Sequence, residues 1–156
     1  MKAKNCLIFG GTGQIGRNLI RKLAKNNYKV TVITRNAHTK GNFIKTQANA
    51  GYIDIVEANP FDEKEINLLL AKADICINLI GILFEKGKKN SFNNIHANFP
   101  MILAKLCHQN KINQFIHVSA LGIDKAVDSK YAISKLTGER NVFRHFNKSV
   151  ILRPSV

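Results

Sequence analysis

The stretch LIFGGTGQIG, residues 7–16, places four glycines directly behind a short apolar run near the start of the chain. In nucleotide-binding α/β sheets, a glycine-rich turn between a first strand and a first helix receives the pyrophosphate of a dinucleotide. Gly10 would make the tight turn out of the strand, Gly13 would let the backbone approach the phosphates, and Gly16 would let helix and strand pack closely. The helix beginning near Gln14 would direct free N–H groups and its positive dipole end at the negative charge.

The spacing of the turn is Gly-x-x-Gly-x-x-Gly, which differs from the Gly-x-Gly-x-x-Gly of ordinary dehydrogenases. By itself such a cluster can serve backbone geometry alone, so the rest of the chain decides its meaning. Apolar β-branched runs alternate with longer amphipathic runs, which is typical of parallel sheets covered on both faces. We expect strands at 4–9, 29–34, 52–57, 74–80, 113–119 and 149–153, and helices at 14–26, 62–72, 91–110 and 129–146.

The pattern predicts an α/β fold, namely a Rossmann-type doubly wound parallel sheet of about six strands with helices on both faces. Two local sequence signals refine the expected helices. Asp62 is a plausible N-cap, and Glu65 three residues later would complete a capping box. Pro100 lies inside the third expected helix, so that helix should be irregular before it.

The composition describes one globular domain, residues 1–156, with 45% hydrophobic and 22% charged residues. The longest apolar run, 75–84, contains Asn78 and Gly81 and is too short to span a bilayer. Residues 1–5 leave no room for a separate leader before the first apolar run, so we expect a cytoplasmic protein. The three cysteines are far apart in apolar surroundings, which predicts buried reduced thiols and no metal site.

A net charge of +14 raises the possibility of nucleic-acid binding, because clustered Lys and Arg side chains displace phosphate counterions. The basic residues are instead scattered, with only small groups such as Lys86, Lys88 and Lys89. This distribution does not favour a nucleic-acid partner. It does predict a general attraction to anionic ligands or surfaces.

The end of the second expected strand bears on the choice of nucleotide. An acidic residue there would hold the ribose hydroxyls of NAD, whereas a basic residue suits the extra phosphate of NADP. The chain reads TRNAHTK over 34–40 and offers no carboxylate. Arg35 presents a planar fork of donors that matches a phosphate, with Lys40 and His38 as lesser contributors. We therefore expect NADP(H) over NAD(H); the alternative is that Arg35 is a solvated loop residue.

The glycine spacing and the segment YAISK, residues 131–135, together resemble the short-chain dehydrogenase/reductase superfamily in its extended or atypical branch. The segments INLIG (77–81), FIHVSALG (115–122) and LRPS (152–155) are most similar to the NAD-dependent epimerase/dehydratase-like group that is related to the NADPH-binding accessory subunit of respiratory complex I. This resemblance covers nearly the whole chain. It implies the fold and the cofactor more securely than an activity, because members of that subunit group are thought to hold NADPH mainly as a structural ligand.

In catalytic members the tyrosine of Tyr-x-x-x-Lys exchanges a proton with the substrate oxygen while hydride moves to or from the nicotinamide. The resemblance gives this role to Tyr131, with Lys135 on the same helical face as the cation that lowers the phenol pKa and binds the ribose. Ser119 would hold the substrate oxygen, and the segment 78–81 would line the nicotinamide ribose. The expected cofactor-binding residues are Gly10, Thr12, Gly13, Gln14, Ile15, Gly16, Arg35, Asn78, Gly81 and Lys135.

Other interpretations stay open at two of these positions, Tyr131 and Ser119. Only eleven residues separate Ser119 from Tyr131, a short gap for a catalytic member, so Tyr131 can equally be a structural residue on an amphipathic helix. Ser119 can equally cap the strand end. His117 is expected to be a packed residue, and Asp62 to be a helix cap more than an adenine contact.

In the families it resembles, the Arg153-Pro154-Ser155 segment leads into the substrate-binding region, which this sequence lacks. The chain is therefore expected to be a fragment or a shortened gene product with a substrate pocket open on one side. Two functions follow. One is oxidoreductase or epimerase chemistry on a carbonyl or sugar-nucleotide substrate. The other is a non-catalytic scaffold or assembly subunit of a respiratory complex, peripheral to the inner membrane.

Overall fold

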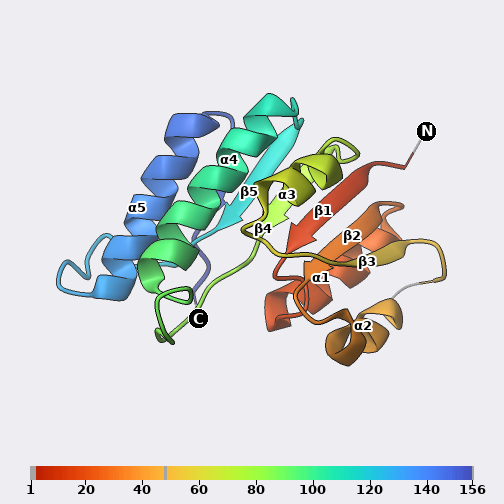
Figure 1. Cartoon of the computed structure of the whole chain (residues 1–156), viewed down its shortest axis with the longest axis horizontal. Helices are drawn as coiled ribbons and strands as arrows, with labels where there is room; N and C mark the ends of the chain where they lie inside the picture. The colour runs from red at the N-terminus through yellow and green to blue at the C-terminus, as the bar shows by residue number, and fades with distance from the viewer. Residues whose placement is uncertain (1–2, 48, 156) are drawn as a thin grey trace.

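The computed structural model of the chain describes residues 3–47 and 49–155. Six parallel strands form one sheet in the order β3-β2-β1-β4-β5-β6 (Figure 1). Crossover connections from strand to parallel strand produce this order, which is that of the doubly wound dinucleotide-binding fold. The strands are β1 (Asn5–Phe9), β2 (Lys29–Thr34), β3 (Ile53–Glu57), β4 (Ile75–Asn78), β5 (Gln114–Val118) and β6 (Val150–Leu152). The expected fold class is confirmed.

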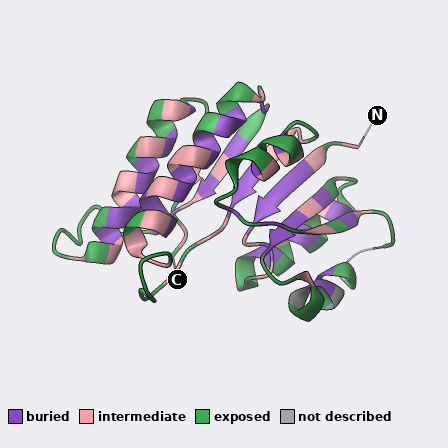
Figure 2. Cartoon of the chain, in the orientation of Figure 1, coloured by how far each residue is buried: buried purple, intermediate pink, exposed green. Residues whose placement is uncertain are grey.

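The helices divide between the two faces of the sheet because alternate strand residues point to opposite sides. In β1, Leu7 and Phe9 pack in the apolar cluster with α3, α4 and α5, whereas Cys6 and Ile8 pack in the cluster with α1 and α2. Figure 2 shows the central strands buried along most of their length. The helices are α1 (Gln14–Lys25), α2 (Ala37–Lys45), α3 (Glu63–Leu70), α4 (Phe99–Gln109) and α5 (Lys130–His145).

Helix α2 was not expected from the sequence. Its segment AHTKGNFIK has little apolar periodicity and a central glycine, and Asn36 makes no side-chain cap hydrogen bond. Tertiary contacts supply what the local sequence lacks. The carboxylate of Glu57 accepts the N–H of Ala37 at 2.8 Å, and Ile44 is buried in the core.

The third expected helix is irregular in its first part, as predicted from Pro100. Residues Asn93–Asn98 form a π-helix, η1, and α4 begins directly after it with Pro100 in its first turn. A proline has no N–H to donate and crowds the carbonyl four residues earlier, so a wider turn before it is the expected accommodation.

Asp62 caps α3 as predicted, because its side chain accepts the N–H groups of Lys64 and Glu65. The second half of the capping box differs from the expectation. The Glu65 carboxylate accepts the N–H of Asn59 at 3.2 Å, and the N–H of Asp62 donates to the Asn59 carbonyl. The first turn of α3 therefore holds the segment that follows β3.

The cysteines Cys6, Cys76 and Cys107 are free and buried, as predicted. Burial, with a smaller contribution from Asp74, raises the pKa of the Cys6 thiol to about 12. Burial likewise raises the pKa of Cys76. These thiols act as small apolar core groups.

Candidate functional site

The glycine turn lies between β1 and α1, and at two of its glycines, Gly10 and Gly16, a side chain would collide with backbone atoms. Gly10 has a φ of +77°, and a Cβ there would lie 2.9 Å from the carbonyl carbon of Leu79. A Cβ on Gly16 would overlap the backbone of Gly11. The turn can therefore pass under the β4 loop and pack on α1 only because these positions are glycine.

The N-terminus of α1 directly follows the glycine turn, and no side chain caps it. Gly13 is its N-cap, and its first turn has no acidic residue. The first hydrogen bond into the helix runs from the Arg17 N–H to the Gly13 carbonyl. The N–H groups of Gln14, Ile15 and Gly16 consequently have no partner within the helix, as at any helix start, and Ile15 is 52% exposed.

A cavity of about 280 Å³ opens at the carboxyl ends of the central strands, where β1 separates the two halves of the sheet. This crevice is where open parallel sheets place their ligands. Arg35 carries the only charge among the described residues that line it. The cavity is lined by residues at or just beyond the carboxyl ends of the strands and by three residues further along the chain. They are Gly10, Thr12 and Gly13 from the turn, Ile33 and Thr34 at the end of β2, Arg35 and Asn36 after it, Ala58, Pro60 and Phe61 after β3, Leu79 to Ile82 after β4, and Asn90, Ile95 and Phe99.

Arg35 directly follows β2, as expected, and its side chain contacts Asn90, which also lines the cavity. Its Nη1 donates to the Oδ1 of Asn90 at 3.5 Å, and the side chain is otherwise exposed. His38 is exposed on α2. The side chain of Lys40 lies outside the described part of the chain.

Tyr131 and Lys135 lie one turn apart on α5. Lys135 is 5% exposed, its Nζ donates to the Val118 carbonyl at 3.4 Å, and it stands 6.0 Å from the centre of the Tyr131 ring. A Cβ on Gly81 would lie 3.4 Å from the same Nζ, so the lysine reaches the rim of the cavity. Burial lowers the pKa of Lys135 to about 8 and raises the pKa of Tyr131.

Asn78 and Ser119 are brought near this group but do not line the cavity. Asn78 is fully buried; its Nδ2 donates to Nδ1 of His117 at 3.1 Å, and its Oδ1 accepts the N–H of Ile80. Ser119 is 5% exposed just beyond β5. His117 is packed, as predicted, and burial lowers its pKa to about 3.

One functional candidate was missed by sequence reasoning. His96 of η1 is 1% exposed and hydrogen-bonds both the loop after β4 and helix α5. A single histidine in an otherwise ordinary segment gives no periodic or motif signal, and its partners are 14 and 38 residues away.

The sheet order and the position of the cavity together define a Rossmann-type α/β domain. Residues 6–155 match the model of the NAD dependent epimerase/dehydratase family. The chain belongs to that family, which confirms the resemblance inferred from the sequence.

Among curated proteins the chain is similar to NADH dehydrogenase (ubiquinone) 1 alpha subcomplex subunit 9, mitochondrial, of Arabidopsis thaliana. The two are 30% identical over 149 residues, which make up 95% of this chain and 37% of the relative. The mouse protein of the same name is 28% identical over 148 residues, with 39% of its length covered. The chain thus spans about two fifths of the curated relatives it matches.

Solved structures agree on the fold. A putative NAD-dependent epimerase/dehydratase from Bacillus halodurans superposes with a TM-score of 0.81 at 20% identity, over 98% of this chain and 71% of that one. UDP-glucuronic acid 4-epimerase from Bacillus cereus, solved in complex with NAD, gives a TM-score of 0.79 at 21% identity, over 97% and 56%.

Within residues 3–47 and 49–155, no helix combines the length and apolar character needed to cross a membrane. The same residues contain no group of three or more His, Cys, Asp or Glu side chains suited to a metal ion.

Proposed function

We propose that the chain binds a nicotinamide dinucleotide in the cavity at the glycine turn, with the pyrophosphate on the N-terminus of α1. The observation that carries the proposal is the coincidence of three features: glycines that admit no side chain, uncapped helix N–H groups and an adjoining cavity. Main-chain donors and the helix dipole at such a place favour an anionic group. The relatives named above include a protein solved with NAD.

We propose NADP(H) as the preferred form. Among the described residues that line the cavity, Arg35 alone is charged, and it follows β2, where the adenosine ribose binds in this fold. A guanidinium can bind a phosphate through two hydrogen bonds, whereas two ribose hydroxyls would be better served by a carboxylate. Asn90, which accepts a hydrogen bond from Arg35, would hold the fork in place.

We propose Tyr131, Lys135 and Ser119 as the groups that would carry oxidoreductase or epimerase chemistry on a carbonyl or sugar-nucleotide substrate. When bound, the dinucleotide supplies hydride transfer at its nicotinamide ring. Tyr131 would exchange a proton with the substrate oxygen, and the Lys135 ammonium would favour its ionised form. Ser119 would donate a hydrogen bond to that oxygen.

A second candidate is a non-catalytic scaffold that holds the dinucleotide within a larger assembly such as a respiratory complex. The raised pKa of Tyr131 favours this scaffold candidate. Burial raises the pKa of the phenol, whereas a proton acceptor near neutral pH needs a lowered pKa. Several curated relatives are named as respiratory NADH dehydrogenase subunits. In this case the partners would be other subunits, and the protein would sit at the periphery of a membrane.

Thermal unfolding with NADPH, with NADH and without nucleotide tests the binding proposal. A nucleotide at a hundred times its dissociation constant should stabilise the chain by about 2.7 kcal/mol. At the same concentration of each nucleotide, NADPH should stabilise the chain more than NADH, and Arg35→Ala should remove the difference. Equal shifts with both nucleotides in the unsubstituted chain would refute the preference for NADPH.

Tyr131→Phe separates the two candidates. Under the enzymatic candidate it abolishes turnover of a carbonyl or sugar-nucleotide substrate, whereas under the scaffold candidate there is no turnover to lose. The nucleotide-dependent stabilisation should be unchanged in both cases, because the phenol hydroxyl is not proposed to hold the dinucleotide.

A further inference from the structure

His96 connects two parts of the molecule that would have to act together. Its Nε2 accepts the backbone N–H of Ile82 at 3.0 Å. Its Nδ1 lies 2.9 Å from the Oγ of Ser134, whose hydroxyl donates to the carbonyl of Tyr131 at 2.7 Å. Ile82 lines the cavity, and Tyr131 lies in the first turn of α5.

The hydrogen-bond roles of the ring follow from its partners. A backbone N–H can only donate, so Nε2 must be the unprotonated nitrogen. The Ser134 hydroxyl donates its single hydrogen to the Tyr131 carbonyl. Nδ1 of His96 must therefore carry the ring hydrogen and donate it to the Ser134 Oγ. The result is one directed chain of donors from Ile82 through His96 and Ser134 to Tyr131, and it requires a neutral imidazole.

Packing fixes the ring in this orientation. The Phe92 ring stacks on the imidazole with centroids 5.4 Å apart, and the Tyr131 ring meets it edge-on at 5.2 Å. Gly138 of α5 lies against the backbone carbonyl of His96 so closely that a Cβ would overlap it. The π-helix and α5 thus approach at backbone distance, and the imidazole has little freedom to turn away.

We propose that His96 is a positioning residue that holds the cavity wall at Ile82 in a fixed relation to Tyr131 on α5. The inference rests on the proposed binding of a dinucleotide in that cavity. Without the acceptor at Nε2, the Ile82 N–H would be left unpaired beside the core, and the loop after β4 would move to hydrate it. The dinucleotide would then have to order the wall as it binds, and its affinity would fall.

The electrostatic surroundings keep the ring in the neutral form. Burial, followed by the nearby positive charge of Lys135, lowers the pKa of His96 to about 4. The ring therefore offers one acceptor and one donor at neutral pH, as the hydrogen-bond chain needs.

Two substitutions to amide side chains distinguish the two hydrogen bonds of the His96 ring, the one at Nε2 and the one at Nδ1. In His96→Gln the side-chain Oε1 can take the place of Nε2 and accept the Ile82 N–H. In His96→Asn the side-chain Nδ2 can take the place of Nδ1 and donate to Ser134, but nothing reaches Ile82. Both variants lose the ring packing, so both should melt at lower temperature.

Isothermal titration calorimetry with NADPH on the full chain should then give unequal results. We expect His96→Gln to bind within about threefold of the unsubstituted chain and His96→Asn to bind about tenfold more weakly. A merely structural role would lower the melting temperature of both variants without separating their affinities. Equal affinities of His96→Asn and the unsubstituted chain would overturn the proposal.

Amide hydrogen exchange of Ile82 in the ligand-free chain makes a test that does not depend on the nucleotide. The Ile82 amide should stay protected in His96→Gln. It should also stay protected in Ser134→Ala, which removes only the hydrogen bond at His96 Nδ1. It should lose its protection in His96→Asn. If the unsubstituted chain binds no dinucleotide, the proposed function fails while this exchange pattern still decides the His96–Ile82 contact. Unchanged protection in His96→Asn would refute that contact.

Discussion

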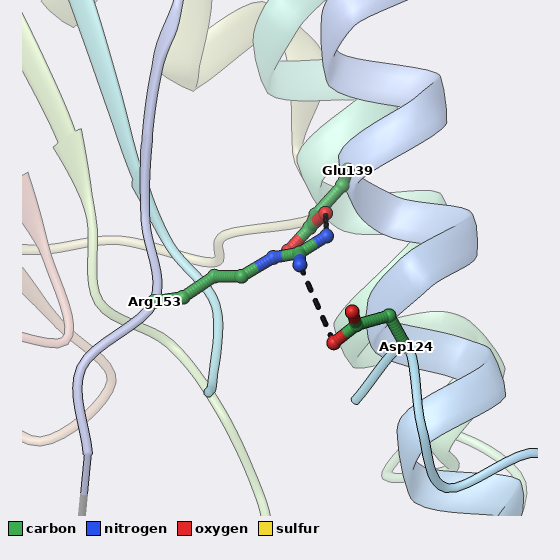
Figure 3. Close-up of polar contacts among 3 residues, drawn as sticks. All are labelled: Asp124, Glu139 and Arg153. Atoms are coloured by element: carbon green, nitrogen blue, oxygen red, sulfur yellow. Dashed lines mark hydrogen bonds and ion pairs between the residues drawn. The ribbon is translucent and has the colours of Figure 1, made fainter. Parts of the chain in front are cut away.

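Arg153 donates two hydrogen bonds to the carboxylate of Glu139, from Nε to Oε1 at 2.9 Å and from Nη2 to Oε2 at 2.6 Å (Figure 3). Asp124 adds a looser ion pair with the same guanidinium at 3.5 Å. Glu139 projects from α5 and is largely buried, whereas Arg153 follows β6. The pair therefore fastens the segment after the last strand to the helix that carries Tyr131 and Lys135.

Arg153→Ala should lower the free energy of unfolding by about 1–2 kcal/mol, because it leaves a mostly buried carboxylate without its donors. Asp124→Asn is the matched control. Its pair with Arg153 is exposed and longer, so its removal should change stability by less than about 0.5 kcal/mol. Chemical denaturation measures both, and a similar small effect of the two substitutions would contradict this assignment.

The same pair gives a pH dependence of defined sign. Burial is the largest single influence and acts to raise the pKa of Glu139, but the hydrogen bonds and positive charge of Arg153, together with smaller contributions from Ser119 and His117, hold the pKa below its ordinary value. A carboxyl with a lowered folded pKa stabilises fully above its unfolded pKa, and this contribution is lost as pH falls through the folded value. Arg153→Ala should therefore show its deficit at neutral pH and lose it in acid.

Stability should also fall in mild acid because two histidines are buried in neutral form. The pKa of His96 is lowered to about 4 and that of His117 to about 3, in both cases mainly by burial. Below the ordinary value of 6.5 the unfolded chain takes up protons that the folded chain does not. Each histidine then contributes a slope of up to about 1.4 kcal/mol per pH unit, with stability falling as pH falls.

Denaturation between pH 7.5 and 5 measures this slope. His96→Gln should reduce it by about half because one of the two buried groups no longer titrates. His38→Gln, at an exposed position on α2, should leave it unchanged. An undiminished slope in His96→Gln would show that His96 does not titrate in this way.

Gly16→Ala should destabilise the chain by about 3 kcal/mol and abolish nucleotide binding, since its methyl group would overlap the Gly11 backbone. Gly41→Ala in α2 serves as the comparison. A Cβ there makes ordinary contact with Ile55, 3.4 Å away, and alanine is the better helix former. Thermal unfolding should rank Gly41→Ala at or above the unsubstituted chain; a tolerated Gly16→Ala would contradict the geometry of the turn.

The thiols should be unreactive in the folded chain. Cys6, Cys76 and Cys107 are all buried, and the thiolate is the reactive form. A thiol reagent at pH 8 should label none of them rapidly under native conditions and all three in denaturant. Rapid native labelling of one thiol would show that the core around it opens readily.

Sequence reasoning recovered the elements whose signals are local. The turn at 7–16, the cap at Asp62 and the break at Pro100 each follow from the conformational needs of one or two residues. Helix α2 was missed because Glu57, twenty residues away, supplies the contact that its own sequence lacks. The alternation of strands and helices was sufficient to predict the sheet because crossovers between parallel strands almost always have the same handedness.

The candidate site was only partly predictable for the same reason. Gly10, Gly13, Arg35 and Gly81 line the cavity, as residues at the carboxyl ends of strands should. Asn78 turns instead to His117, and His96 joins Ile82 to Ser134. Such pairings between buried polar groups depend on tertiary packing and leave no periodic trace in the chain.

The central claim is that main-chain nitrogens of the glycine turn bind the pyrophosphate of a dinucleotide. A titration of the ¹⁵N-labelled chain with NADPH, followed by amide chemical shifts, tests it most directly. The largest shifts should fall on residues 11–16, with smaller ones at Arg35 and Ile82. Unchanged amide positions at millimolar NADPH and NADH, or shifts confined to a surface away from this turn, would contradict it.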